Sequence, residues 1–350
     1  MAYLFAILGL SVLIVVHELG HMWIARLSGM RVHTFSVGFG PALLRWRGRR
    51  TTYQLALVPL GGYVQIAGMN PAEPIAPDDP GSYSNKSALA RVATIAAGPI
   101  TNYVLASLVM VMVMLTWGAP RWEHLVGEVV KSSPAARAGM KAGDRIEAIE
   151  GKPTPGVGDI LDAIAASEGR KLSVQVLRDG KSRLVTVAPE PRKKGKGYRI
   201  GIGFRRRLAF SEIGAGDALA KGLYYPIYES RRALSALGQV LSKLARGDIS
   251  DARQVGGPVE IVHQLSLSFR ESTVVALIFL AMLSAYLGLF NLLPVPALDG
   301  GRLLFLFSAI LLRRKVNQRF EQAVHTVGFL LLVGILMLVT YCDVARRMGE

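Results

Sequence analysis

The N-terminal apolar stretch contains three ionisable side chains, His17, Glu18 and His21, in the string HELGH. Residues i and i+4 lie on one face of an α-helix, so the two imidazoles can bind one metal ion. Zinc brings the pKa of water from about 16 towards 7. Glu18 could take the proton of that water and return it to a leaving amine. The pattern therefore predicts a zinc-dependent protease with Glu18 as its catalytic base.

The hydrophobic context strengthens this prediction. A charged group at the centre of a spanning helix costs about 2.5–3.5 kcal/mol on insertion scales, so such groups persist mainly where they have a function. The alternative is that these residues merely line a helix interface. A catalytic zinc usually has three protein ligands, and the third candidate is Asp299, which ends another apolar stretch in the string NLLPVPALDGG. A structural role for Asp299, such as capping, is the alternative there.

Four stretches are long and apolar enough to span a bilayer, for which about 20 helical residues suffice. We expect these spans at about 3–27, 90–117, 273–298 and 325–341. By the positive-inside rule, two basic loops face the cytoplasm; they contain Arg45, Arg47, Arg49 and Arg50, and Arg313, Arg314, Lys315 and Arg319. Residues 122–272 and both termini are then outside. The first and third spans run in the same direction, which brings the histidines and Asp299 to one depth, towards the cytoplasmic side.

The segment between the second and third spans has the signals of a small α/β domain. Ser133 and Pro134 fit a helix N-cap followed by proline at the first helical position, and Gly139 fits the helix end. Strands are expected at 125–130, 144–149, 172–177 and 184–187, with Asp179-Gly180 as a hairpin turn and a helix that opens at Asp159. Two amphipathic stretches, 218–244 and 258–269, are interpreted as helices on the membrane face.

The composition fits a chain divided between lipid and water, because 51% of its 350 residues are hydrophobic and its formal net charge is +16. The basic residues occur at segment ends and in the run 192–196, with no nucleic-acid-binding motif beside them. Membrane topology and contact with anionic lipid account for this charge, so we expect lipid and not nucleic acid as a partner. The single cysteine, Cys342, excludes an internal disulfide.

Several strings, in this order and spacing, resemble the site-2 protease family of intramembrane zinc metalloproteases, in particular its bacterial RseP type. They are HELGHMWIAR, PLGGYVQIAG, AAGPITNY, QVGGPVEIV and NLLPVPALDGG. The string GMKAGDRIEAIEGKPT resembles the core of a PDZ domain, for which an unrelated small α/β insert is the alternative. The resemblance covers nearly the whole chain.

The resemblance implies that His17, His21 and Asp299 bind Zn²⁺, that Glu18 is the general base, and that Asn291 holds the substrate backbone or the transition state. It implies substrates that are single-pass membrane proteins, cut within or near the bilayer after an upstream site-1 protease has removed their outer part. Anti-sigma factors and signal-peptide remnants are examples. It also implies the bacterial inner membrane as location, with the PDZ-like domain in the periplasm.

The first loop is similar to the family's membrane-associated β-hairpin, here at about 32–66. Alternation in 52–58 indicates a strand, and Gly61-Gly62 indicates a turn. An exposed strand edge can pair with an unwound substrate, so the resemblance assigns Gly61 and Gly62 to substrate binding. A lipid-facing loop without substrate contact is the alternative. The chain departs from many relatives at Tyr286, where they have asparagine, and has room for one PDZ-like domain where some have two.

We therefore expect a polytopic α-helical membrane protein with about four transmembrane helices, a membrane-associated β-hairpin and an inserted α/β PDZ-like domain. The expected parts are an N-terminal membrane part (1–121), a periplasmic PDZ-like domain (122–190), a linker with amphipathic periplasmic helices (191–272) and a C-terminal membrane part (273–350). Two rival functions are a zinc-binding membrane protein without hydrolytic activity and a scaffold built on the PDZ-like domain. Glu18 argues against the first, and the ionisable residues within the spans argue against the second.

Overall fold

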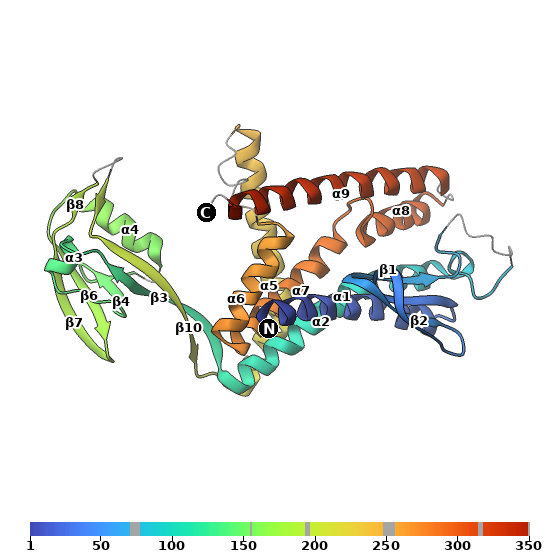
Figure 1. Cartoon of the computed structure of the whole chain (residues 1–350), viewed down its shortest axis with the longest axis horizontal. Coiled ribbons are helices and arrows are strands. Elements are labelled where there is room, and N and C mark those ends of the chain that lie inside the picture. Colours follow the sequence, from blue (N-terminus) through green and yellow to red (C-terminus); the bar gives the residue numbers. More distant parts are fainter. Residues whose placement is uncertain (71–77, 155, 193–196, 248–255, 314–317, 349–350) are drawn as a thin grey trace. The chain divides into compact units, whose positions relative to one another are not determined.

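The computed structural model describes residues 1–70, 78–154, 156–192, 197–247, 256–313 and 318–348. The chain forms two compact units, which are drawn in Figure 1. Unit 1 comprises Met1–Thr116 and Gly214–Glu350, and unit 2 comprises Trp117–Ile213. Most of the basic run at 192–196 lies outside the described residues, as do Arg314 and Lys315 of the last basic loop.

Within its described residues, unit 1 contains four helices that are long and apolar enough to cross a membrane. They are α1 (Ala2–Leu27), α2 (Ala88–Trp117), α7 (Thr273–Leu292) and α9 (Gln318–Met348). Their number confirms the expectation of about four spans. The two amphipathic stretches form α5 (Ala215–Ala245) and α6 (Pro258–Glu271). Both pack against α7, and α6 also packs against α1.

The third span is shorter than the sequence predicts. Helix α7 ends at Leu292, and Leu293 is extended, with φ −64° and ψ 143°. Leu293 precedes Pro294, and the residue before a proline is driven out of the helical region. A separate helix, α8 (Asp299–Leu312), begins at Asp299. The expectation that the span continues to residue 298 is therefore wrong, because the two prolines place Asp299 after a break.

Helices α1 and α2 cross at a point where both carry small residues. A Cβ atom added to Gly20 of α1 would lie 2.6 Å from the carbonyl oxygen of Ala97 in α2. Close approach of this kind is what small residues permit between spanning helices. The crossing brings residues 94–102 of α2 against the histidine-bearing turn of α1.

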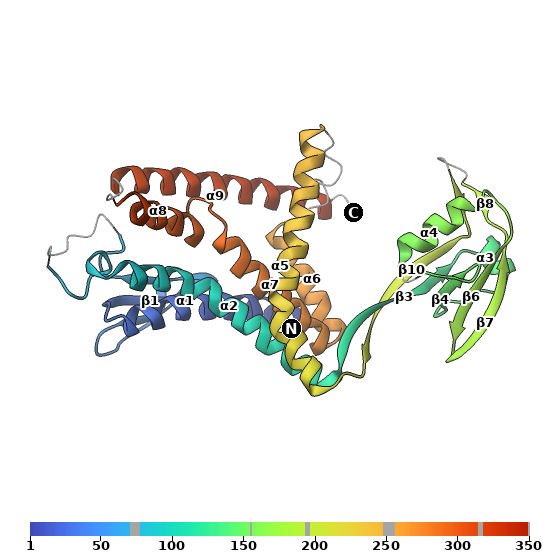
Figure 2. The same ribbon diagram turned by 180° about the vertical axis from the view of Figure 1, so that it is seen from behind.

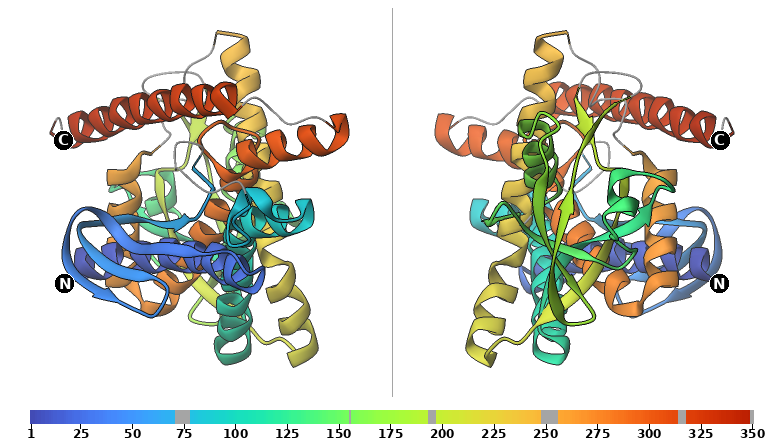
Figure 3. Two further views of the ribbon diagram at one scale, coloured as in Figure 1. Left: turned by 90° about the vertical axis from the view of Figure 1, so that its right-hand side faces the viewer. Right: turned by 90° about the vertical axis from the view of Figure 1, so that its left-hand side faces the viewer.

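A two-stranded sheet, β1 (Val32–Arg47) and β2 (Thr52–Ile66), packs beside α1, as Figure 3 shows in blue. Residues 34–37 of β1 pair with residues 52–55 of β2 and also with residues 62–65. Strand β2 therefore passes along both sides of this part of β1. Gly61-Gly62, expected as a turn, lies inside β2 where the strand changes sides. The φ of Gly61 is +121°, which glycine tolerates.

Unit 2 is built on a sheet with strand order β10-β3-β4-β6-β7. Its main strands are β3 (Ala119–Val129), β4 (Arg145–Ile149), β6 (Leu172–Arg178), β7 (Lys181–Val187) and β10 (Ile202–Ser211). The shorter elements are α3 (Pro134–Arg137), β5 (Lys152–Pro153), β8 (Glu190–Pro191) and β9 (Tyr198–Arg199). Helix α4 (Val157–Ala166) lies over the sheet (Figure 2), and its Ile160 and Ile164 are buried in the same core as Val126, Val174 and Val176.

The turn and cap signals of unit 2 have direct structural counterparts. The Ser133 hydroxyl accepts a hydrogen bond from the Ala136 N–H, with Pro134 at the first helical position. Asp179 and Gly180 both have positive φ, 51° and 75°, as a two-residue hairpin turn requires. Asp159 does not open its helix, because α4 begins at Val157. Its carboxylate instead accepts a hydrogen bond from the N–H of Gly156, the residue before the helix.

The expected domain limits of 122 and 190 are too narrow. Strand β10 pairs with β3 along its whole length, from Ile202–Val129 to Ser211–Ala119. Unit 2 therefore continues to Ile213 and includes part of what we assigned to a linker. The sequence of β10 hides it, because three consecutive arginines, residues 205–207, interrupt the alternation of apolar residues that predicts a strand.

Candidate metal centre and active site

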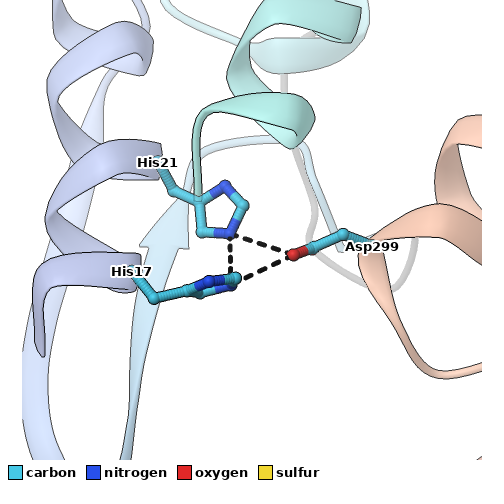
Figure 4. A group of neighbouring side chains, drawn as sticks. All are labelled: His17, His21 and Asp299. Carbon is cyan, nitrogen blue, oxygen red and sulfur yellow. Dashed lines mark hydrogen bonds and ion pairs between the residues drawn. The ribbon is translucent and has the colours of Figure 1, made fainter. Parts of the chain in front are cut away.

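Three candidate ligands converge in unit 1. Nε2 of His17 lies 3.1 Å from Oδ2 of Asp299 and 3.1 Å from Nε2 of His21, and the His21–Asp299 distance is 3.3 Å (Figure 4). The two histidines come from consecutive turns of α1, and Asp299 approaches from the start of α8. Both imidazoles are buried. The sequence thus predicted the proximity of His17 and Asp299, which are 282 positions apart in the chain.

The donor atoms fit a zinc ion. Two bonds of about 2.0–2.1 Å, arranged tetrahedrally, separate their donor atoms by roughly 3.3–3.4 Å. The three distances between the donor atoms of His17, His21 and Asp299 are 3.1, 3.1 and 3.3 Å. Two neutral imidazoles and one carboxylate are also the ligand types of hydrolytic zinc sites. These residues could therefore hold a divalent metal ion by three atoms and leave one position open.

Helix α2 contacts the Nδ1 atoms of the two imidazoles, the ring nitrogens that do not face the candidate metal position. Nδ1 of His21 lies 2.8 Å from the carbonyl oxygen of Thr94, and Nδ1 of His17 lies 3.0 Å from the side-chain amide of Asn102. A carbonyl only accepts, so Nδ1 of His21 donates and its Nε2 lone pair points at the centre. Such partners fix the orientation of metal-binding imidazoles.

Gly98 of α2 leaves the space that the two imidazoles fill. A Cβ atom built on Gly98 would lie 2.2 Å from Nε2 of His21 and 2.8 Å from Nε2 of His17. Neither distance is possible for a real Cβ atom without movement of the rings or helix. The missing side chain is thus a geometric requirement of the centre.

Glu18 lies on the β2 side of the centre. Its carboxylate interacts with the backbone of Val64 and, electrostatically, with His17, His21 and Asp299. A Cβ atom built on Gly62 would lie 3.5 Å from Cγ of Glu18. The carboxylate is therefore held between the candidate ligands and the 62–65 segment of β2.

The other predicted site residues stand further from these contacts. Asn291 lies in the last turn of α7, and its amide donates to the carbonyl oxygen of Leu287 in the same helix. Gly61 packs against Phe39 of β1. Gly62 is the predicted substrate residue that the structure places against Glu18. The hydroxyl of Tyr286, the unusual residue of α7, donates to Glu229 of α5.

Four residues that shape the centre were not predicted from the sequence. They are Thr94, Gly98 and Asn102 of α2, and His325 of α9, whose Nδ1 accepts a hydrogen bond from the N–H of Ala297 in the loop before Asp299. Asn102 and His325 had a usable signal, because each is a polar side chain within an apolar span. Thr94 contributes through its backbone and Gly98 through an absent side chain, and neither leaves a sequence signal of this kind.

The similarity of the chain to known proteins agrees with this geometry. A model of peptidase family M50 matches residues 5–335. The chain is 33% identical over 344 residues to a predicted zinc metalloprotease of Clostridium perfringens, covering 98% of each chain. It is 28% identical over 410 residues to the zinc metalloprotease RasP of Geobacillus kaustophilus, covering 95% of each.

Among solved structures, the PDZ domain of an SdrC-like protein from Listeria monocytogenes covers 23% of this chain and 86% of that chain. Its sequence identity is 23%, and its TM-score of 0.22 is too low to define the fold of unit 2. The match to the family model, in contrast, extends over both membrane parts and includes all the candidate ligands. The chain therefore belongs to peptidase family M50, and it is a zinc metalloprotease of the site-2 type.

Proposed function

We propose that the chain cuts single-pass membrane proteins within or near the bilayer, with His17, His21 and Asp299 as zinc ligands and Glu18 as general base. The observation that carries this proposal is the set of 3.1–3.3 Å separations among the three donor atoms. These residues belong to an apolar helix and to a helix break beside another apolar helix. The reaction centre is then within the membrane part of the chain.

The chemistry divides between the metal and the protein. When bound, zinc supplies a Lewis acid that makes water a nucleophile at neutral pH. The Glu18 carboxylate accepts the proton of the attacking water and gives it to the leaving amine nitrogen. The interaction with the Val64 backbone keeps this carboxylate on the β2 side, so that it faces a substrate lying there. Asn291 hydrogen-bonds the substrate backbone or the developing oxyanion after its amide leaves Leu287.

The substrate lies along residues 62–65 of β2. Those residues pair with β1 and are adjacent to Glu18 through Gly62. A helical substrate hides its peptide carbonyls in its own hydrogen bonds, so it must unwind before it is cut. Addition to a strand satisfies the freed backbone groups and presents the carbonyl to the base. Gly62 presents no side chain towards Glu18, and Gly61 supplies the φ of +121° where β2 changes sides, so both glycines position the substrate strand.

The physiological setting follows from the family and the charge distribution. The substrates are anti-sigma factors or signal-peptide remnants, already shortened by an upstream site-1 protease. The chain resides in the bacterial inner membrane and contacts its lipid. Because the basic loops face the cytoplasm, unit 2 is periplasmic, and the centre lies towards the cytoplasmic side.

The test uses the full chain purified in detergent and a single-span model substrate trimmed on its outer side. Wild-type enzyme should cut within or beside the span, as mapped by mass spectrometry, and bind one zinc per chain by elemental analysis. Glu18→Gln should bind zinc equally and not cut, whereas His17→Ala should lose zinc. Stoichiometric zinc in an inactive wild type, across several unrelated spans, would instead favour a zinc-binding protein without hydrolytic activity.

A second proposal concerns unit 2, which we propose docks an extended peptide by its apolar C-terminal side chain. A cavity of about 580 Å³ lies between α4 and the start of β10. Its apolar lining includes Leu161, Ile164, Ile202 and Phe204, and Arg192 and Arg199 add positive charge. Strand β10 is at the edge of its sheet, with β3 as its neighbour, so a peptide strand can be added there.

Peptide docking is testable by fluorescence anisotropy with a labelled peptide that ends in valine, titrated with the full chain. Leu161→Glu places a charge in the cavity and should abolish binding. Leu184→Glu is the matched control, because Leu184 is exposed on β7 and does not line the cavity. Binding that depends on neither residue, or that survives amidation of the peptide's C-terminus, would contradict this mode.

A further inference from the structure

Asn102 of α2 is buried within unit 1, and its side-chain amide contacts the imidazole of His17. Its side chain is fully buried, and its Nδ2 atom lies 3.0 Å from Nδ1 of His17. Its Oδ1 atom has no hydrogen-bond partner among the residues that the structure describes. Its backbone carbonyl accepts from the hydroxyl of Ser284 in α7, so the residue is held by a second span. A buried amide oxygen without a partner is unfavourable, and this makes the orientation of the Asn102 amide worth testing.

The protonation of His17 decides which amide atom must face it. A neutral imidazole has one N–H group, so a ring that offers Nε2 to a metal has its proton on Nδ1. Nε2 of His17 faces His21 and Asp299, as a ligand atom must. Nδ1–H then needs an acceptor, and the amide nitrogen cannot accept. A half-turn of the Asn102 amide replaces Nδ2 by Oδ1 at nearly the same position, and the two ends of an amide differ little in shape.

We propose that Asn102 is a positioning residue that sets the metal-binding tautomer of His17 through Oδ1. This inference rests on the proposed role of His17 as a ligand. Thr94 does the same for His21 with a backbone carbonyl, so α2 presents one acceptor to each imidazole. The two acceptors are eight residues apart on one helix, on either side of Gly98, whose missing side chain gives the rings their room.

The experiment measures zinc affinity of the full chain in detergent by competition with a chelator of known affinity, together with the visible spectrum of the Co²⁺-substituted enzyme. Asn102→Leu has nearly the same shape but no acceptor, and its zinc affinity should fall 10- to 100-fold, the usual cost of losing such a partner. Asn102→Asp keeps an oxygen against Nδ1–H, and its affinity and Co²⁺ spectrum should match or exceed those of the wild type. Ser107→Ala removes a different buried polar group of α2, the Ser107 hydroxyl, and controls for general destabilisation.

Each outcome either supports or contradicts the proposal. Loss in Asn102→Leu with retention in Asn102→Asp supports the proposal. Wild-type affinity in Asn102→Leu overturns it, and so does equal loss in both variants, because the amide nitrogen would then be the required group. If Asn102→Leu does not fold, Asn102→Asp alone decides, since weak zinc binding in it contradicts the proposal. Retention of zinc by His17→Ala would instead refute the ligand set.

Discussion

The backbone N–H of Ala297 donates a 2.9 Å hydrogen bond to Nδ1 of His325, so helix α9 holds the loop that leads to Asp299. Ala297 has a φ of +72°, which side-chain-bearing residues rarely adopt. A second contact lies one turn along α9, where a Cβ atom on Gly328 would come within 2.3 Å of Pro296. The position of the candidate ligand Asp299 thus depends on contacts of the preceding loop with helix α9.

His325→Ala should lower the zinc affinity of the centre, although His325 is not one of the candidate ligands. The partly buried N–H of Ala297 would lose its acceptor, and the loop would lose its anchor. Chelator competition should show zinc affinity reduced roughly tenfold or more, with proteolysis reduced in parallel. Thr326→Ala, on the exposed neighbouring position, should bind zinc like the wild type. Unchanged zinc affinity in His325→Ala would show that the loop holds itself.

Gly98→Ala should abolish zinc binding. The added methyl group would lie 2.2 Å from Nε2 of His21, so the rings must turn away from each other or α2 must retreat from α1. Elemental analysis should find less than one zinc per ten chains, and no cleavage should be detectable. The matched control is Gly238→Ala on α5, where no other described part of the chain lies within 4 Å of an added Cβ atom. That change should leave zinc and activity intact, since alanine favours a helix by about 1 kcal/mol over glycine.

Gly62→Ala should separate substrate positioning from metal binding. Its methyl group would lie 2.8 Å from the carbonyl oxygen of Ser36 and 3.5 Å from Cγ of Glu18, so β2 must shift where it passes the base. We expect kcat/KM for a single-span substrate to fall by roughly tenfold or more, because small displacements at a reacting centre have large effects. The zinc content should stay at one per chain. Loss of zinc would mean that β2 supports the ligands as well as the base.

The sequence was most informative where chemistry depends on local spacing. His17 and His21 share a helix face because of the i, i+4 relation, and their burial in an apolar span marked them as functional. Asp299 was predicted as a candidate ligand because a carboxylate beside an apolar span is energetically costly. The two prolines before it, which must break the helix, supported this prediction. Turn and cap signals of unit 2, such as Asp179-Gly180, also held, because they depend on the φ preferences of neighbouring residues.

Relations between distant segments were harder to predict. The end of α7 at Leu292 was open to prediction from Pro294, but the new helix at Asp299 depends on contacts with α9. Strand β10 is recognised by its pairing with β3, because its three arginines interrupt the apolar alternation that would predict a strand. The two-sided pairing of residues 34–37 depends on how β2 folds around β1. In each case the deciding interaction joins residues that no local pattern connects.

The ion pair between the buried Asp144 and Arg178 should contribute to the pH dependence of unit 2. Asp144 is fully buried, and its carboxylate accepts two hydrogen bonds from Arg178, of 2.6 and 2.7 Å, and one from the N–H of Lys141. Burial by itself would raise the pKa of Asp144, but the hydrogen bonds outweigh it and hold the pKa below its usual range. A carboxyl group with a depressed pKa contributes stability above its unfolded pKa, about 3.9, and loses it as the pH falls through the folded value.

Unit 2 should therefore keep its stability from pH 7 down to about pH 4 and lose it below. Hydrogen exchange of β6 in the full chain, corrected for intrinsic rates, should show protection falling only below that point. Asp144→Asn leaves the partly exposed Arg178 without its counter-charge and should cost about 1–3 kcal/mol at neutral pH, while reducing the acid dependence. Asp162→Asn, at an exposed position of α4, should change neither. If Asp144→Asn kept wild-type protection at pH 7, the pair would contribute nothing net, and the acid lability of unit 2 would have to come from other carboxylates.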